Sequence, residues 1–584
     1  MSVKARIKNA PRPLLITGIL FVLLCLGLSG GWLSAHVFSE DAKFEKFADQ
    51  IFLEEVSSNT LNLHYSLANP EEYGIELSPV TLGYITTEDM PAASRQWAQY
   101  EQQLKEFDYD RLSEDNRLTL DMLLLYYNTR QSLGSSFLLE EPLSPSLGIQ
   151  AQLPVLLAEY TFYDTGDISD YLSLLNCVPD YFQSILEFEQ EKSQAGCFMS
   201  DATLERILEQ CQYFVQDPSY MTEVFAEKLE KFSSLKKKDR EELLEKHEEI
   251  LENRMVPAYQ NLMAGLKALE GTGKNPGGLA NFPGGTSYYQ YLLKSDVGVY
   301  ASVPVIEKRL YQQLMADYQE MGALLKENPA LLKDLHSDKD IPGDSPENTL
   351  GALSRLCQED FPALPAASYE VKYVHEALED FLSPAFYLTP PIDTRAPNTI
   401  YINNASRSTN LELFTTLAHE GFPGHLYQNQ YFSLQKPENI RYLITSGGYI
   451  EGWATYIESY AYGYAEIDSD YSRAVWLNRS INLCLYSILD VGIHYRGWTR
   501  EQTASFLSAF GITKDSAIEE LYLYIVETPA NYLKYYLGYL YFQDIKTKAQ
   551  ELQGDSFRLK EFHKKVLEIG PVPFPVLEKY VLEK

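Results

Sequence analysis

Two histidines flank a glutamate in the segment His419-Glu420-Gly421-Phe422-Pro423-Gly424-His425, and their spacing constrains how this part of the chain can fold. In the common zinc-binding motif HExxH the histidines are four residues apart, so on a helix they lie about 40° apart and face one metal ion. Here they are six residues apart, which on an unbroken helix would separate them by about 240°. Pro423 cannot donate the helical hydrogen bond, and Gly424 tolerates strained dihedral angles. We therefore expect the helix that carries His419 and Glu420 to end or bulge near Pro423, so that His425 swings back to the same side.

These residue types are the ones that a hydrolytic zinc site uses. Two neutral imidazoles hold the metal ion, and a carboxylate takes a proton from its water. Glu451 is a candidate third ligand, because it lies 26 residues after His425, far enough for a loop and a return on an antiparallel helix. Two histidines and one glutamate leave a coordination position open, as in catalytic zinc sites. Glu458, seven residues beyond Glu451, faces the same way two turns later and could orient a ligand imidazole.

The motif residues resemble a known protein family. Ala418 to His425 with Gln428, followed by Glu451-Gly452-Trp453-Ala454, is similar to the bacterial domain-of-unknown-function family 885. The resemblance extends over roughly residues 40 to 584, through Tyr387 to Pro391, Asp490 to His494 with Gly497 to Arg500, Pro529 to Gly538, and Gly278-Leu279 with Tyr288-Tyr289. More distantly, Glu451 to Ala454 resembles the Glu-Gly-Phe-Ala block of zinc aminopeptidases, in which the glutamate is the third metal ligand.

The resemblance implies a zinc metallopeptidase of the thermolysin-like, or gluzincin, type. It implies one zinc ion per chain, held by His419, His425 and Glu451, with Glu420 as the general base. By family position, Tyr535 or His494 is expected to donate a hydrogen bond to the oxyanion that forms during hydrolysis.

Other interpretations of these residues remain open. A lone His-Glu pair is usually an accident of a helix surface, as we expect for His247-Glu248 and His375-Glu376, which have no second histidine nearby. Burial for structural reasons is the competing interpretation of His419, His425 and Glu451. Mn²⁺ or Co²⁺ could bind the same ligands as zinc.

The N-terminus indicates export. Four basic residues precede an uncharged apolar stretch from Leu14 to about Val37, which is typical of a signal peptide or a single membrane anchor. Small residues between Ser29 and Ala35 would permit cleavage, so both interpretations stay open. A lipoprotein signal needs a small residue before its cysteine, and Leu24 precedes Cys25. We therefore expect the protein outside the cytoplasm, either anchored to the membrane or secreted.

The composition fits an exported enzyme. The net charge of −32 argues against a nucleic-acid partner. Outside the N-terminal stretch there are five widely spaced cysteines, which give no disulfide framework, although one pair among the first three is possible. The sequence does not indicate an oligomeric state.

The fold class is predicted to be mostly α, with two helical lobes enclosing an active-site cleft. Helical periodicity runs over Asp41 to Leu63, Thr203 to Phe214 and Met221 to about Leu269, with breaks at Gly271 to Pro283 and Ile341 to Pro346. We divide the chain into an N-terminal segment (1–38), a helical lobe (39–285) and a lobe with the zinc site (286–584). Thr399 to Ile402 is predicted as a small β element beside the zinc-binding helix, where an edge strand could hold an extended peptide.

The function expected from the sequence is hydrolysis of peptide bonds by zinc-activated water. Two alternatives use the same residues: a non-catalytic exported binding or scaffold protein, and a zinc hydrolase of amide or ester bonds in non-peptide substrates. The sequence does not distinguish an exopeptidase from an endopeptidase.

Overall fold

The computed structural model describes residues 39–583, except 76–78, 335–340, 344, 366–367, 377–378, 380–381 and 407. The predicted signal peptide or anchor over residues 1–38 lies outside the described residues. Within the described part of the chain, no helix combines the length and the apolar character needed to cross a membrane.

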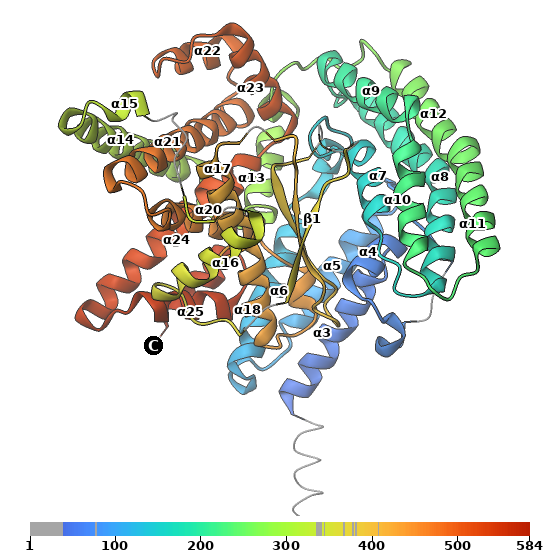
Figure 1. Ribbon diagram of the computed structural model, residues 1–584, viewed down its shortest axis with the longest axis horizontal. Coiled ribbons are helices and arrows are strands. Elements are labelled where there is room, and N and C mark those ends of the chain that lie inside the picture. Colours follow the sequence, from blue (N-terminus) through green and yellow to red (C-terminus); the bar gives the residue numbers. More distant parts are fainter. Residues whose placement is uncertain are drawn as a thin grey trace, which may run out of the picture.

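The prediction of a mostly helical chain with one small β element is confirmed (Figure 1). The helices before the sheet are α3 (Glu40–Val56), α4 (Thr60–Ser66), α5 (Met90–Leu104), α6 (Glu114–Gln131), α7 (Ile149–Glu159), α8 (Thr165–Ala195), α9 (Asp201–Gln216), α10 (Ser219–Glu230), α11 (Lys237–Ile250), α12 (Val256–Lys267), α13 (Gly285–Ser295), α14 (Val303–Glu327), α15 (Leu331–Asp334) and α16 (Pro346–Leu356). Those after it are α17 (Asn410–Glu420), α18 (His425–Leu434), α19 (Ile440–Leu443), α20 (Gly447–Tyr464), α21 (Ser469–His494), α22 (Arg500–Ser508), α23 (Asp515–Glu527), α24 (Asn531–Gln553), α25 (Leu559–Ile569) and α26 (Phe574–Leu582).

The predicted helical stretches are observed, with breaks that the periodicity alone did not place. The stretch from Asp41 to Leu63 forms α3 and α4, because the side chain of Asn59 accepts a hydrogen bond from the backbone N–H of Asn62 and so starts a new helix. The long stretch after Met221 forms α10, α11 and α12, and a π-helical turn at Leu251–Met255 joins the last two. The break predicted near Gly271 separates α12 from α13.

The sheet has three strands in the order β1 (Tyr369–Tyr373), β3 (Asn398–Ile402), β2 (Ala385–Leu388). The predicted strand is β3, which pairs in parallel with β1 and antiparallel with β2. Because β3 is paired on both sides, it has no free edge for a peptide. The edge strand that approaches α17 is β2. Local side-chain alternation does not show which strands pair, so the edge position of β2 could not be predicted from it.

Two large hydrophobic cores meet at this sheet. One contains apolar residues of α3–α6 together with residues from α13 onward, including Ile400 and Ile402. The other lies within α7–α12 and reaches the opposite face of the sheet at Val374 and Tyr401. In Figure 1 the sheet accordingly stands between α7–α12 on the right and the C-terminal helices on the left. The division into lobes at residue 285 stays a prediction. The first core contains residues from both sides of that position.

The five cysteines of the described chain are free, so the pairing left open among the first three is not formed.

Candidate metal centre

The helix that carries His419 and Glu420 ends as predicted. It starts with a capping box between Thr409 and Glu412 and stops at Glu420, and a new helix begins at His425. The chain turns tightly between them: a Cβ atom on Gly424 would lie 1.8 Å from the carbonyl oxygen of His419, so only glycine fits there. The turn brings the two imidazole rings to a centroid distance of 4.7 Å, nearly perpendicular to each other.

Glu451, in the first turns of α20, completes the group. Its Oε2 lies 3.5 Å from Nε2 of His419 and 3.6 Å from Nε2 of His425. Two ligands of a tetrahedral zinc ion at bond lengths near 2.1 Å are about 3.4 Å apart. This Oε2 is buried and has no hydrogen-bond partner among the described residues, as expected for an oxygen atom that faces a metal position. The three residues therefore fit a zinc ion.

Glu420 is a competing candidate for the third ligand. One atom from each of His419, Glu420 and His425 forms a group within 4.8 Å, but Oε1 of Glu420 is 3.9 Å from Nε2 of His419. Its Oε2 already accepts the backbone N–H of Tyr387 at 3.0 Å. Glu451 is closer to both imidazoles, so it is the better candidate for the third ligand, and Glu420 is the carboxylate beside the candidate metal position.

Glu458 orients His419, as its spacing from Glu451 predicts. Its Oε1 is 2.9 Å from Nδ1 of His419, and its Oε2 accepts a hydrogen bond from Nε of Arg479, on α21, at 3.0 Å. Burial alone would raise the pKa of Glu458, but Arg479 and His419 lower it to about 2. Because an ionised carboxylate only accepts, Nδ1 of His419 carries a proton, which leaves Nε2 as the nitrogen that would bind a metal ion.

The electrostatics of the site favour a divalent cation. With neutral histidines, as a bound metal ion requires, Glu420, Glu451 and Glu458 carry three negative charges against one positive charge on Arg479, which leaves two negative charges in a partly buried place. Burial alone would lower the pKa of His419, yet contacts with Glu451 and Glu458 and the charge of Glu420 raise it to about 10. Burial would also raise the pKa of Glu451, but His425 and His419 hold it well below its usual range. Positive charge is thus stabilised between these side chains.

Two contacts outside the ligand set hold the geometry in place. The indole N–H of Trp453, which is fully buried, donates to the carbonyl oxygen of Pro423 at 3.0 Å and so fixes the turn between the histidines. Helices α20 and α24 cross backbone to backbone, because a Cβ atom on Gly452 would lie 2.5 Å from Cα of Gly538. This crossing places Tyr535 of α24 beside the metal position.

Tyr535 belongs to the group. Its ring stacks on that of His419 with centroids 6.3 Å apart, and none of the described residues is hydrogen-bonded to its hydroxyl group. Burial, together with the charges of Glu451 and Glu420, raises the pKa of Tyr535 far above its usual value. The hydroxyl therefore stays protonated and is available as a donor.

His494 is placed elsewhere. Its Nδ1 accepts the backbone N–H of Leu279 at 3.1 Å, and its Nε2 donates to the carbonyl oxygen of Ile525 at 2.8 Å. Burial lowers its pKa to about 4, so it is neutral. With both nitrogens bonded to the backbone, His494 joins helices and has no N–H left for a substrate, and we do not include it in the catalytic group.

A cavity of about 350 Å³ adjoins the metal position. His425 and Glu451 form part of its wall, with Tyr387, Phe432 and Tyr442. Gln428 also lines it, and its side-chain nitrogen is buried with no partner among the described residues, so it could donate to a ligand. A molecule in this cavity would therefore contact His425 and Glu451.

Sequence reasoning missed three contributors to this site. The roles of Trp453 and Gly538 were not inferred, although both lie in segments that carry the family resemblance. No pattern in the sequence pointed to Arg479, because it lies 21 residues after Glu458 on a different helix.

Comparison with known proteins places the chain in a family. The model of a family described as "Bacterial protein of unknown function (DUF885)" matches residues 79–581. The chain belongs to this family. The resemblance seen in the sequence is therefore confirmed, while the peptidase activity that it implied stays a prediction for this DUF885 member. No curated protein matches the chain.

Two solved structures are similar to it. A crystal structure described as that of "the putative lipoprotein from Colwellia psychrerythraea" has a TM-score of 0.81 at 20% identity, covering 93% of this chain and 99% of the other. A structure described as "a putative lipoprotein of unknown function from Shewanella oneidensis" has a TM-score of 0.62 at 17% identity, covering 92% and 99%. At these identities the likeness shows a shared fold.

Proposed function

We propose that this protein is a zinc metallopeptidase that works outside the cytoplasm. The observation that carries the proposal is the position of Glu451 Oε2, 3.5 and 3.6 Å from the Nε2 atoms of His419 and His425 and without a hydrogen-bond partner among the described residues. Glu420 supports catalysis over mere metal storage, because a binding protein has no need of a second, partly buried carboxylate beside the ligands.

A zinc ion held by His419, His425 and Glu451 would supply an acidified water molecule and polarise the substrate carbonyl group. Glu420 accepts a proton from the attacking water and returns it to the leaving amine. Its Oε2 is fixed by the Tyr387 N–H, which leaves Oε1 facing the reaction. The Tyr535 hydroxyl donates a hydrogen bond to the developing oxyanion.

The protonation states suit these roles. Burial raises the pKa of Glu420, although the neighbouring His419 and His425 oppose the shift. A carboxylate with a raised pKa is a stronger base, so it takes a proton from water more readily than a surface glutamate does.

Export is the second part of the proposal. It rests on the basic and apolar N-terminal segment of the sequence and on the description of both similar structures as lipoproteins. An N-terminal signal or anchor would place the helical domain on the far side of the membrane.

The test combines metal content with peptide digestion. We expect Glu420→Gln to keep about one zinc ion per chain by elemental analysis and to lose hydrolysis of a peptide library by at least about a thousandfold. His419→Ala should lose both the metal and the activity. Glu551→Gln removes the same charge from an exposed position of α24 and should match the wild type. Undiminished turnover by Glu420→Gln would refute the mechanism.

The same experiment separates the alternatives. A wild-type protein that binds zinc, cleaves no peptide and cleaves amide or ester compounds is a hydrolase of non-peptide substrates. One that binds zinc and cleaves neither is a scaffold protein.

A further inference from the structure

A second cavity, of about 450 Å³, lies on the face of the sheet that packs towards α7–α12. Its wall includes Thr399 and Tyr401 of β3, which alternate along the strand with Ile400 and Ile402 of the core around α17. The cavity is thus separated from the metal position by the thickness of the sheet, but it shares a wall residue with the cavity beside His425.

Residues after β2 line more than one cavity. Thr389, which follows β2, lines this cavity, the cavity beside His425 and a third one between them. Tyr65, Pro390 and Pro391 also line both the second and the third cavity. Tyr387, two residues before Thr389, donates its N–H to Glu420. The shared residues place the cavities side by side, and an extended peptide advances about 3.3 Å per residue.

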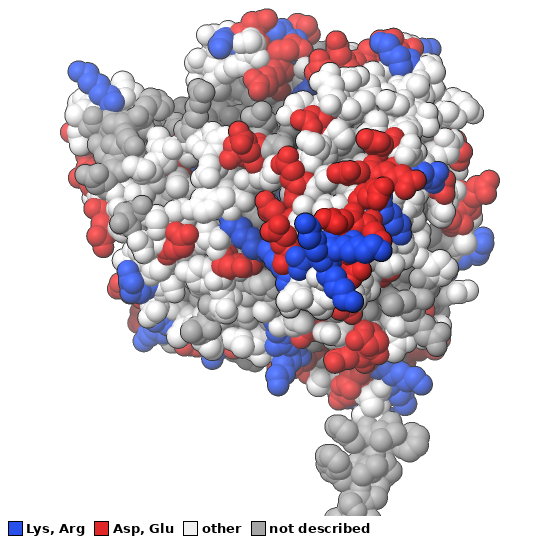
Figure 2. All heavy atoms as spheres, turned by 45° about the vertical axis from the view of Figure 1, so that its right-hand side comes forward, with Lys and Arg blue, Asp and Glu red and all other residues white. Residues whose placement is uncertain are grey.

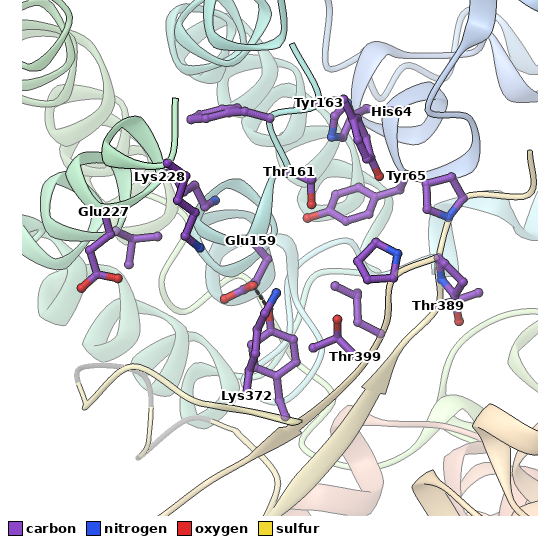
Figure 3. A pocket seen from close by; sticks show the side chains of 18 of the residues that line it. His64, Tyr65, Glu159, Thr161, Tyr163, Glu227, Lys228, Lys372, Thr389 and Thr399 are labelled. Atoms are coloured by element: carbon purple, nitrogen blue, oxygen red, sulfur yellow. Dashed lines mark hydrogen bonds between the residues drawn. The ribbon is translucent and has the colours of Figure 1, made fainter. Parts of the chain in front are cut away.

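Three lysines converge on the second cavity. Lys228 comes from α10, Lys231 follows that helix, and Lys372 comes from β1. Figure 3 shows Lys228 and Lys372 extending from opposite walls towards Glu159. Basic side chains also gather near the middle of the face seen in Figure 2, on a surface with many acidic groups.

Lys228 is the most unusual of the three. Its Nζ donates to the carbonyl oxygens of Ala158 and Tyr160 at the end of α7, which uses two of its three N–H groups. No carboxylate oxygen of the described residues lies within 4.0 Å of the Nζ of Lys228 or Lys231. Burial, with the repulsion of nearby lysines, lowers the pKa of Lys228 to about 8. A partly buried ammonium group without an ion-pair partner is less favourable than a paired one, and a ligand with a negative charge would supply the partner.

The carboxylates near the cavity have other partners or lie at its exposed rim. Lys372 pairs with Glu370 at 2.7 Å, and Glu159, which accepts a hydrogen bond from the Tyr401 hydroxyl group, faces the lysines. Glu227 also lines the cavity, and both it and Lys231 are exposed. Three lysines thus meet three carboxylates, so the missing ion pair of Lys228, and not an excess of charge, distinguishes this site.

We propose that this cavity binds one carboxylate group of the substrate, either an acidic side chain or the C-terminal carboxylate of a peptide whose scissile bond lies at the metal centre. The inference rests on the proposed peptidase function and names its substrate class as peptides with an acidic group several residues from the cleaved bond. Lys228 and Lys231 bind the carboxylate, and Glu159 limits the site to a single negative charge.

The test compares one cleavable eight-residue peptide in four forms: with glutamates or with glutamines beyond the scissile bond, and with a free or an amidated C-terminus. We expect Lys231→Gln to raise KM about 10-fold for the forms that carry the recognised carboxylate, with kcat unchanged, because a charge-assisted hydrogen bond is lost. The form that loses affinity identifies the carboxylate as a side chain or a terminus. Glu159→Gln should have the opposite effect and lower KM for the same forms.

Two controls separate this effect from general ones. Lys237→Gln makes the same charge change at a lysine of α11 whose side chain is 91% exposed and should leave KM unchanged. Lys228→Gln should act as Lys231→Gln does, and thermal melting shows whether it still folds. An equal rise in KM for the neutral amidated peptide, or no rise in any form for Lys231→Gln, would overturn the inference.

Calorimetry on the chelated wild-type protein keeps this inference apart from the proposed activity. If no peptide is cleaved but the glutamate peptide binds wild type more tightly than it binds Lys231→Gln, the peptidase proposal fails and the carboxylate site stands. If both proteins bind it equally, the carboxylate site is refuted whatever the activity.

Discussion

Glu458 provides the sharpest test of the metal centre, because it touches a proposed ligand without touching the metal position. Its Oε1 accepts the Nδ1 proton of His419 at 2.9 Å in a buried place. A hydrogen bond to a charged group contributes about 1.5–3 kcal/mol, and one between neutral groups about 0.5–1.5 kcal/mol. Glu458→Gln keeps an acceptor and loses the charge, so it should weaken zinc binding by about 1.4 kcal/mol, or about 10-fold.

Glu458→Ala removes the acceptor as well and should reach about 100-fold, the upper range for partners of metal ligands. The side chain of Arg479 is 44% exposed and can be solvated when its partner is lost, so its own cost should be small. Zinc affinity is measured by competition with a chromophoric chelator, and Glu551→Gln is the control for a lost surface charge. A Glu458→Ala variant that binds zinc as tightly as the wild type would show that Glu458 does not orient a metal ligand. Equal losses of zinc affinity in Glu458→Gln and Glu458→Ala would show that loss of the acceptor adds nothing to loss of the charge.

Four further predictions concern activity, stability and pH. Tyr535→Phe should lower kcat about 100-fold with little change in KM, because the donor acts on the oxyanion only; an unchanged kcat in steady-state assays would exclude that role. Gly452→Ala should lower the free energy of unfolding, measured by urea titration, by about 3 kcal/mol, since its Cβ would meet the backbone of Gly538. The control Gly463→Ala, on the same helix, has open space around it and should be neutral or stabilising. Burial lowers the pKa of His563 to about 3 from an unfolded value near 6.5, so the unfolded chain binds the proton first as the pH falls. The free energy of unfolding should therefore decrease below pH 6.5, by about 2 kcal/mol from this residue between pH 6.5 and 5. A His563→Gln variant whose free energy of unfolding has the same pH dependence as that of the wild type would contradict this. Removal of metal with a chelator should lower the melting temperature, and added Zn²⁺, but not Mg²⁺, should restore it. A melting temperature that changes neither with the chelator nor with Zn²⁺ would argue against a bound metal.

Much of the candidate site was open to prediction because its elements depend on local chemistry. The end of α17 at Glu420 follows from what proline and glycine do to a helix, and the approach of His425 follows from that end. The alignment of Glu458 with Glu451 follows from the helical repeat alone. The strand at Thr399 to Ile402 follows from side-chain alternation, but its central position does not, since pairing depends on segments before it in the chain.

The sequence by itself determined the helical class, the donor atoms and the break that allows two histidines six residues apart to face each other. The tertiary structure decided the remainder: that Arg479 neutralises Glu458, that Gly452 and Gly538 bring Tyr535 to His419, and that His494 is bonded to the backbone instead. It also decided that lysines of α10 and β1 share a cavity that has a wall residue in common with the cavity beside His425. The physical reason is range: backbone breaks and helical repeats act over a few residues, whereas charge partners and close helix crossings join residues that only the packed chain brings together.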